Sequence, residues 1–139
     1  MFDVALAEAG AQVPIATSSD ENFPPENIID GKSETFWATT GLFPQEFIIT
    51  FTALMSLEQI KINCYQVKGL AMERSIENEP VNFEPMCEKE LCPSDASLQM
   101  EEFSGENSSA KHLKFVIKSG YDHFVSVHKV CVNGMASRE

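Results

Sequence analysis

The stretch PPENIIDGKSETFWATTG contains five closely spaced residues that offer oxygen atoms to a ligand or permit a tight turn: Asn27, Asp30, Gly31, Lys32 and Thr35. Hard cations such as calcium bind several oxygens from carboxylates, carbonyls and hydroxyls. Asp30 offers a carboxylate, and Gly31 permits a sharp reversal of the chain because glycine tolerates positive φ. Thr35 adds a hydroxyl and a carbonyl, and the sole tryptophan, Trp37, can anchor the loop in the core. The residue types therefore predict an oxygen-lined loop that can hold a divalent cation.

Two further residues of this loop, Asn27 and Lys32, can add backbone carbonyls to the ligand set. The alternative is an ordinary turn, because Asp-Gly is among the commonest turn dipeptides and Asp caps turns through its own side chain. An EF-hand is excluded here, since the alternating acidic ligands and the closing glutamate are missing. The residues alone therefore leave two readings, an ordinary turn or a site for an ion such as calcium whose ligands would be Asn27, Asp30, Lys32 and Thr35.

Other residues with reactive side chains form no catalytic pattern. No serine lies in a G-x-S-x-G elbow, and no glycine-rich phosphate loop is present. His123 and His128 are an odd number of residues apart, so on an extended strand they face opposite sides and do not share a metal. We therefore expect no enzyme activity and structural, hydrogen-bonded roles for the histidines.

The composition restricts the class of partner. The chain has 139 residues, which suits one domain, and 43% of them are apolar. Its net charge of −11 repels phosphate backbones and anionic lipids but attracts metal cations or basic protein surfaces. The sequence contains no signal-peptide pattern and no apolar run of membrane-spanning length, so we expect a cytoplasmic protein with reduced cysteines.

Short runs with alternating apolar residues predict the elements that carry this loop. Strands are expected over residues 46–52, 58–65, 111–119 and 123–134, separated by Gly and Pro turn signals. Weaker strands are expected near 70–75, 81–83 and 98–103, whereas ENIID can form one helical turn and MCEKELC at most a short helical piece. This pattern is typical of an all-β sandwich or jelly roll.

The apolar residues of these runs give a first estimate of the core. Val125 and Val127 have opposite parity to Val130 and Val132, and a β-bulge between the two pairs would reconcile them. Cys64 is expected to be a small buried hydrophobe. Three residues are candidates either for an outward apolar face or for the other side of the core: Ile48, Val116 and Val125.

The loop described first resembles the opening motif of discoidin-type domains in the galactose-binding-like superfamily. Their pattern is Asn-x-x-Asp-Gly-x-x-x-Thr-x-Trp, and it is matched at Asn27, Asp30, Gly31, Thr35 and Trp37. The resemblance implies that residues 1–139 form a single jelly-roll domain of eight or nine strands. It also implies a structural calcium ion held by this loop, with a further backbone ligand near 132–134.

A second resemblance extends over nearly the whole chain. The segments ATSSDENFPPENIIDGKSETFWATTGLFPQEFIITF, EPVNFE and YDHFVSVHKV are similar to small ciliary proteins of the intraflagellar transport machinery. This resemblance implies a non-catalytic subunit of the intraflagellar transport B complex, located in the cytoplasm and the cilium. The implied partners are a Rab-like small GTPase, intraflagellar transport protein 27, and the other subunits of that complex.

Two alternative functions are compatible with the fold. One is a lectin-like domain that binds carbohydrate or another ligand, but the loop ATTGLFPQE after Trp37 offers only Leu42 and Phe43 where sugar-binding members expose aromatic or basic residues. The other is a chaperone-like stress protein, although the sequence does not resemble an α-crystallin domain.

Overall fold

A computed structural model describes residues 2–17, 24–32, 35–39, 43–93, 98–121 and 125–136. The elements follow in chain order as β1 (Phe2–Asp3), the 3₁₀ turn η1 (Ala7–Ala9), β2 (Gln12–Ala16), the 3₁₀ turn η2 (Pro25–Ile29), β3 (Trp37–Ala38), β4 (Gln45–Tyr65), β5 (Val67–Ser75), β6 (Glu84–Glu90), β7 (Gln99–Gly120) and β8 (Ser126–Ala136). The eight strands pair in antiparallel fashion. The predicted all-β class is therefore confirmed. No helix in the described residues has the length and apolar character to cross a membrane.

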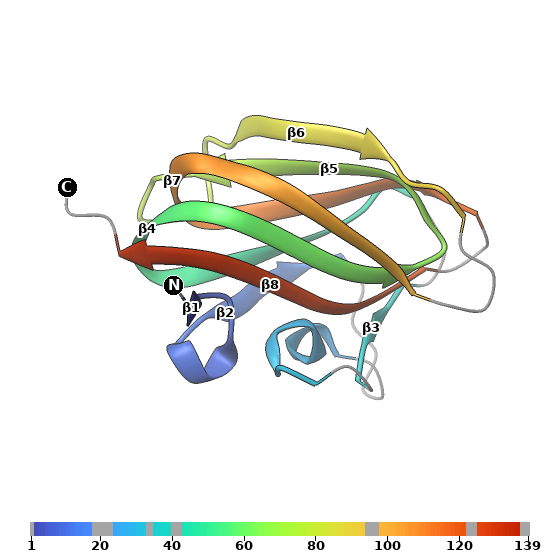
Figure 1. Cartoon of the computed structure of the whole chain (residues 1–139), viewed down its shortest axis with the longest axis horizontal. Helices are drawn as coiled ribbons and strands as arrows, with labels where there is room; N and C mark the ends of the chain where they lie inside the picture. The colour runs from blue at the N-terminus through green and yellow to red at the C-terminus, as the bar shows by residue number, and fades with distance from the viewer. Residues whose placement is uncertain are drawn as a thin grey trace.

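The two longest strands, β4 and β7, form one bent ribbon that belongs to both layers of the sandwich. Thr50 lies opposite His112, and the next pair is Met55 opposite Ala110. The four residues 51–54 of β4 therefore lie opposite a single residue of β7, and β4 bends out there. Figure 1 shows both strands turning back at the same end of the molecule. The expected strands 46–52 and 58–65 are thus the two halves of one element, and 98–103 and 111–119 are likewise joined in β7.

The two halves of this ribbon pair with different strands. In the first layer, the order is β2-β4-β7-β5-β6, because β2 pairs with the first half of β4 and β5 with the second half of β7. In the second layer, β8 pairs with the second half of β4 and also holds β1 and β3. The core lies between the layers, and the predicted inward side chains are all buried: Phe47, Ile49, Phe51, Ile60, Ile62, Cys64, Leu113, Phe115 and Ile117.

The expected β-bulge in the last strand is confirmed. Asn63 lies opposite Lys129 and Cys64 opposite Val127, which leaves His128 as the extra residue of β8. The bulge turns both valine pairs inward, and all four are buried: Val125, Val127, Val130 and Val132. Val125 is therefore a core residue and does not belong to an outward face.

The strand expected near 81–83 is wrong. These residues belong to the turn after β5, where the Ser75 hydroxyl donates a hydrogen bond to the Val81 carbonyl. The strand lies instead at β6, which covers most of MCEKELC. Because β6 is an edge strand that pairs only with β5, it needs no regular apolar face, and its charged sequence gave no strand pattern.

The cysteines differ sharply in burial, which predicts selective thiol chemistry. Burial, with a smaller contribution from Glu101, raises the pKa of the Cys64 thiol to about 12, whereas Cys92 is exposed. At mildly alkaline pH we expect iodoacetamide to modify Cys92 in the folded protein and Cys64 only after unfolding, because the thiolate is the nucleophile. Mass spectrometry of peptides from native and urea-treated samples measures this. Equal modification of both cysteines in the native protein would contradict the burial of Cys64.

Candidate functional site: the Asp30 loop

The loop that contains Asp30 is positioned by the 3₁₀ turn η2. Pro24 is extended and Pro25 starts the turn, which suits the fixed φ of proline. Ile28 and Ile29 are buried beneath the turn and hold it against the core. Asp30 then follows directly at the end of η2, so its carboxylate projects from a segment that is fixed by packing.

The Asp30 carboxylate organises the residues that follow it. Its Oδ1 accepts a hydrogen bond from the backbone N–H of Lys32 at 2.8 Å, and its Oδ2 accepts one from Thr35 Oγ1 at 2.6 Å. The Lys32 carbonyl oxygen lies 3.5 Å from the same hydroxyl. Three of the four predicted ligands, Asp30, Lys32 and Thr35, are therefore linked to one another through the Asp30 carboxylate and the Thr35 hydroxyl.

Gly31 provides the reversal that the sequence predicted. Its φ is +78°, in the left-handed region that L side chains avoid. A Cβ atom at this position would lie 3.1 Å from Leu6 Cδ2, so the loop also approaches the segment before η1 closely. Both the backbone conformation and this contact explain why glycine follows Asp30.

Asn27 has a second role that the sequence did not indicate. Its side-chain Nδ2 donates a hydrogen bond to the Phe36 carbonyl at 3.0 Å, which ties the start of the loop to its end. The prediction for Asn27 was a backbone carbonyl ligand, and that prediction remains open. The link spans nine residues, so the local side-chain-to-backbone patterns of Asn gave no signal for it.

Trp37 anchors the far end of the loop, as predicted. It begins β3, lies opposite Val127 of β8 and is fully buried. Its ring contacts Phe47 edge-on at a centroid distance of 5.2 Å, and Phe47 stacks on Phe115 at 4.9 Å. The loop is thus fixed at both ends, by η2 before Asp30 and by this aromatic row after Thr35.

The donor set of the loop fits a hard cation in its chemistry. It consists of one carboxylate, one hydroxyl and one carbonyl, all oxygens, which is the ligand type of calcium. Among the described residues, no three His, Cys, Asp or Glu side chains form a cluster. These residues therefore contain no ligand set typical of zinc or iron. Residues 132–134 pair with β1 and β4, and no described hydrogen bond links them to Asp30. The calcium site and its backbone ligand near 132–134 remain predictions.

The histidines described in the structure have structural contacts. His112 is buried, with Nδ1 2.7 Å from Thr50 Oγ1 and Nε2 2.9 Å from the Glu77 carbonyl. His128 lies 3.2 Å from the Ser126 hydroxyl and against the Phe36 ring. These contacts agree with the expected hydrogen-bonded roles. His123 lies outside the described residues.

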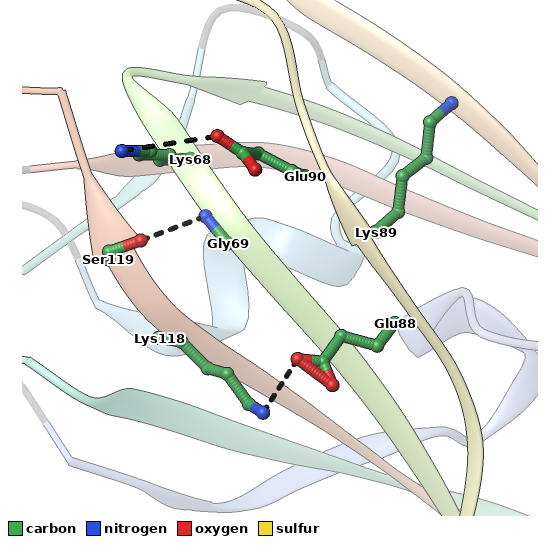
Figure 2. A pocket seen from close by; sticks show the side chains of 7 residues that line it. All are labelled: Lys68, Gly69, Glu88, Lys89, Glu90, Lys118 and Ser119. Carbon is green, nitrogen blue, oxygen red and sulfur yellow. Dashed lines mark hydrogen bonds and ion pairs between the residues drawn. The ribbon is translucent and has the colours of Figure 1, made fainter.

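A separate surface pocket of about 280 Å³ lies over β5 between β6 and β7. Figure 2 shows Lys118 reaching toward Glu88 and Lys68 toward Glu90, at N–O distances of 2.7 and 3.9 Å. The described lining residues are Lys68, Gly69, Glu88, Lys89, Glu90, Lys118 and Ser119. Among the described residues, the lining consists mainly of charged side chains and includes no aromatic ring on which a sugar could stack.

Comparison with solved structures finds the same fold in other proteins. The C-terminal domain of a chitobiase from Bacteroides fragilis superposes with a TM-score of 0.79 and 21% identity, covering 96% of this chain and 99% of that one. A family 32 CBM from C. perfringens NanJ, solved in complex with galactose, gives a TM-score of 0.78 and 15% identity, covering 94% and 97%. These likenesses confirm the galactose-binding-like jelly roll.

Comparison with known sequences gives a narrower result, although no family model matches the chain. An intraflagellar transport protein 25 homolog of Homo sapiens is 50% identical over 96% of this chain and 92% of its own length. Intraflagellar transport protein 25 of Chlamydomonas reinhardtii is 41% identical over 96% of this chain and 70% of its own length. Identity of this extent, on a confirmed jelly roll, shows that the chain belongs to the intraflagellar transport protein 25 family.

Proposed function

We propose that this protein is a non-catalytic subunit of the intraflagellar transport B complex and forms a heterodimer with a Rab-like small GTPase, intraflagellar transport protein 27. The observation that carries the proposal is its family membership, since relatives at 41–50% identity over 96% of the chain are named for intraflagellar transport. The net charge of −11 supports a protein partner with a basic surface rather than nucleic acid or anionic lipid.

Calcium has a structural role in this proposal. The ion would be held by the Asp30 carboxylate, the Thr35 hydroxyl and the backbone carbonyls of Asn27 and Lys32. The support is that the Asp30 carboxylate, the Thr35 hydroxyl and the Lys32 carbonyl lie near one another in a loop that is fixed at both ends. An ion that binds only the folded state adds to the free energy of unfolding.

Co-expression with the GTPase tests the heterodimer. We expect the tagged chain to retain the untagged GTPase through affinity and size-exclusion steps, and the complex to elute as one species at the summed mass. An unrelated Rab-family GTPase, co-expressed in the same way, is the matched control. Separate elution of the two proteins at micromolar concentration would show that the proposed heterodimer is wrong.

A lectin-like function is the second candidate, because a structural neighbour was solved in complex with galactose. The paired charges of the pocket over β5 speak against sugar binding at that position. A glycan array distinguishes the two functions. We expect no glycan above background, and saturable binding of one sugar class would favour the lectin-like alternative.

A further inference from the structure

The turn of the Asp30 loop has a contact that neither end of the loop provides. The 3₁₀ turn η2 fixes the chain before Asp30, and the buried Trp37 fixes it after Thr35. At the turn itself, the position that a Cβ atom of Gly31 would occupy lies 3.1 Å from Leu6 Cδ2. Figure 1 shows η1, which follows Leu6, next to η2 below β8. The turn therefore rests against a segment from the N-terminal part of the chain.

Leu6 belongs to a short segment that runs from the end of β1 to η1, and we call residues 3–6 the N-terminal strap. Val4 and Ala5 are buried and belong to the core cluster, whereas Leu6 is half-buried. Burial of two successive apolar residues attaches the strap to the sandwich. The strap is therefore held by packing directly before the residue that contacts Gly31.

The Asp3 side chain attaches the first end of the strap to β8. Its Oδ1 accepts hydrogen bonds from the backbone N–H of Ala5 at 2.9 Å and from that of Val132 at 3.0 Å. The Val4 N–H donates in turn to the Val132 carbonyl at 2.8 Å. The bond to Ala5 closes a turn through the Asp side chain, as is common for this residue type. The other two bonds connect that turn to a strand of the core, since Val132 is fully buried.

The second end of the strap is fixed by η1. The Leu6 carbonyl accepts hydrogen bonds from the Ala9 N–H at 2.9 Å and from the Ala11 N–H at 3.3 Å. Gly10, with a φ of +95°, ends η1 and turns the chain toward β2. Leu6 thus lies between a turn that is bonded to β8 and a closed 3₁₀ turn, so little backbone freedom remains to move its side chain away from Gly31.

We propose that Leu6 is a positioning residue for the Asp30 loop, and that Asp3 acts through Leu6 by attaching the strap to β8. The strap supports the turn at Gly31 and thereby keeps the Asp30 carboxylate on its hydrogen-bond donors. The consequence for a cation rests on the proposed role of calcium. A carboxylate that is already held in place loses less freedom when an ion binds, so a loosened strap weakens the binding of the ion.

Hydrogen exchange, measured by NMR in excess EGTA, tests the positioning without any ion. We expect the Lys32 amide to exchange about tenfold faster in Leu6→Ala than in the wild type, because the bond of this N–H to Asp30 Oδ1 opens more often. Leu6→Met refills the contact and should stay within about threefold of the wild type. Met86→Ala, on the distant edge strand β6, is the control for a general loss of stability and should leave the Lys32 rate unchanged. An unchanged rate in Leu6→Ala, or an equal rise in Met86→Ala, overturns the proposal.

Variants of Asp3 separate the position of the strap from the charge of the carboxylate. Asp3→Ala removes the acceptor of two hydrogen bonds, and we expect it to raise the Lys32 exchange rate about as much as Leu6→Ala does. Asp3→Asn keeps an acceptor oxygen and should exchange at nearly the wild-type rate, so equal effects of the two Asp3 variants would contradict positioning. Because both residues act through one contact, the double variant Asp3→Ala/Leu6→Ala should exchange at most about twice as fast as the faster single variant. Multiplication of the two single effects overturns the link through the strap.

Isothermal titration of the same variants with calcium tests the consequence for the ion. We expect the Kd of Leu6→Ala to rise about tenfold, the lower end of the range for residues that orient a metal ligand, whereas Leu6→Met and Met86→Ala keep the wild-type Kd. An unchanged Kd in Leu6→Ala overturns the role of the strap in ion binding. A wild-type protein that takes up no calcium overturns the proposed role of calcium, and the exchange of the Lys32 amide then still decides whether the strap positions the loop.

Discussion

Replacement of Trp37 by alanine is expected to lower the free energy of unfolding by about 3–5 kcal/mol, the range for a buried tryptophan. The residue is fully buried, and its ring is the first of the aromatic row that continues through Phe47 and Phe115. The truncation would leave a cavity between the two layers, next to the β3–β8 pairing. It would also release the end of the Asp30 loop from its anchor.

Denaturant titration measures this loss, followed by circular dichroism because the variant has no tryptophan fluorescence. Trp37→Phe retains a ring in the cavity, and we expect it to be clearly more stable than the alanine variant. Met100→Ala, at a side chain that is 73% exposed, is the surface control and should change stability by about 0.5 kcal/mol or less. A loss below about 1 kcal/mol for Trp37→Ala would contradict its place in the core.

The strands could be predicted where alternation and burial coincide. Phe47 and Ile49, and again Ile60 and Ile62, face the core as the period of two indicated. What periodicity could not show is that these runs form one strand. The bend at residues 51–54 is fixed by the shift against β7, which is a contact between segments far apart in the sequence.

The edge strand β6, in contrast, could not be predicted from the sequence pattern. Its residues include three glutamates and one lysine, and only Met86 and Cys87 pack against the core. Its position follows from the backbone groups that β5 offers, not from an apolar face of its own. Sequence patterns detect such strands poorly because burial supplies little of their stability.

Some features of the candidate site could likewise be predicted from the sequence, and others could not. The hydrogen bonds from Lys32 and Thr35 to Asp30 are local and agree with the turn that an Asp side chain can cap, whereas the binding of calcium by these residues stays a prediction. Contacts between strands are not local, since the register of the sheet decides which residues lie opposite one another. Ile48 and Val116 were candidates for an outward face, but only the register separated them from Val125, which is in the core.

Calcium is expected to stabilise the folded wild-type protein and to have no such effect on Asp30→Asn. At a free calcium concentration about 100 times the Kd, the gain is about 2.7 kcal/mol, which corresponds to a rise of roughly 10 °C in melting temperature for a chain of this size. The physical reason is that Asp30 supplies the only carboxylate among the predicted ligands, and the neutral amide cannot replace its charge.

The calcium effect must be separated from the role of Asp30 in the loop itself. Its carboxylate accepts hydrogen bonds from Lys32 N and Thr35 Oγ1, so removing it costs about 1–2 kcal/mol even with excess chelator. The difference between melting temperatures with calcium and with EGTA isolates the ion's contribution within each protein. Glu26→Gln removes an exposed carboxylate on η2 and should retain the full difference. If the wild type melts at the same temperature in both buffers, calcium is not held by the folded chain. If Asp30→Asn keeps the wild-type difference, the ion does not depend on the Asp30 carboxylate that accepts from the Thr35 hydroxyl, and the predicted ligand set is wrong.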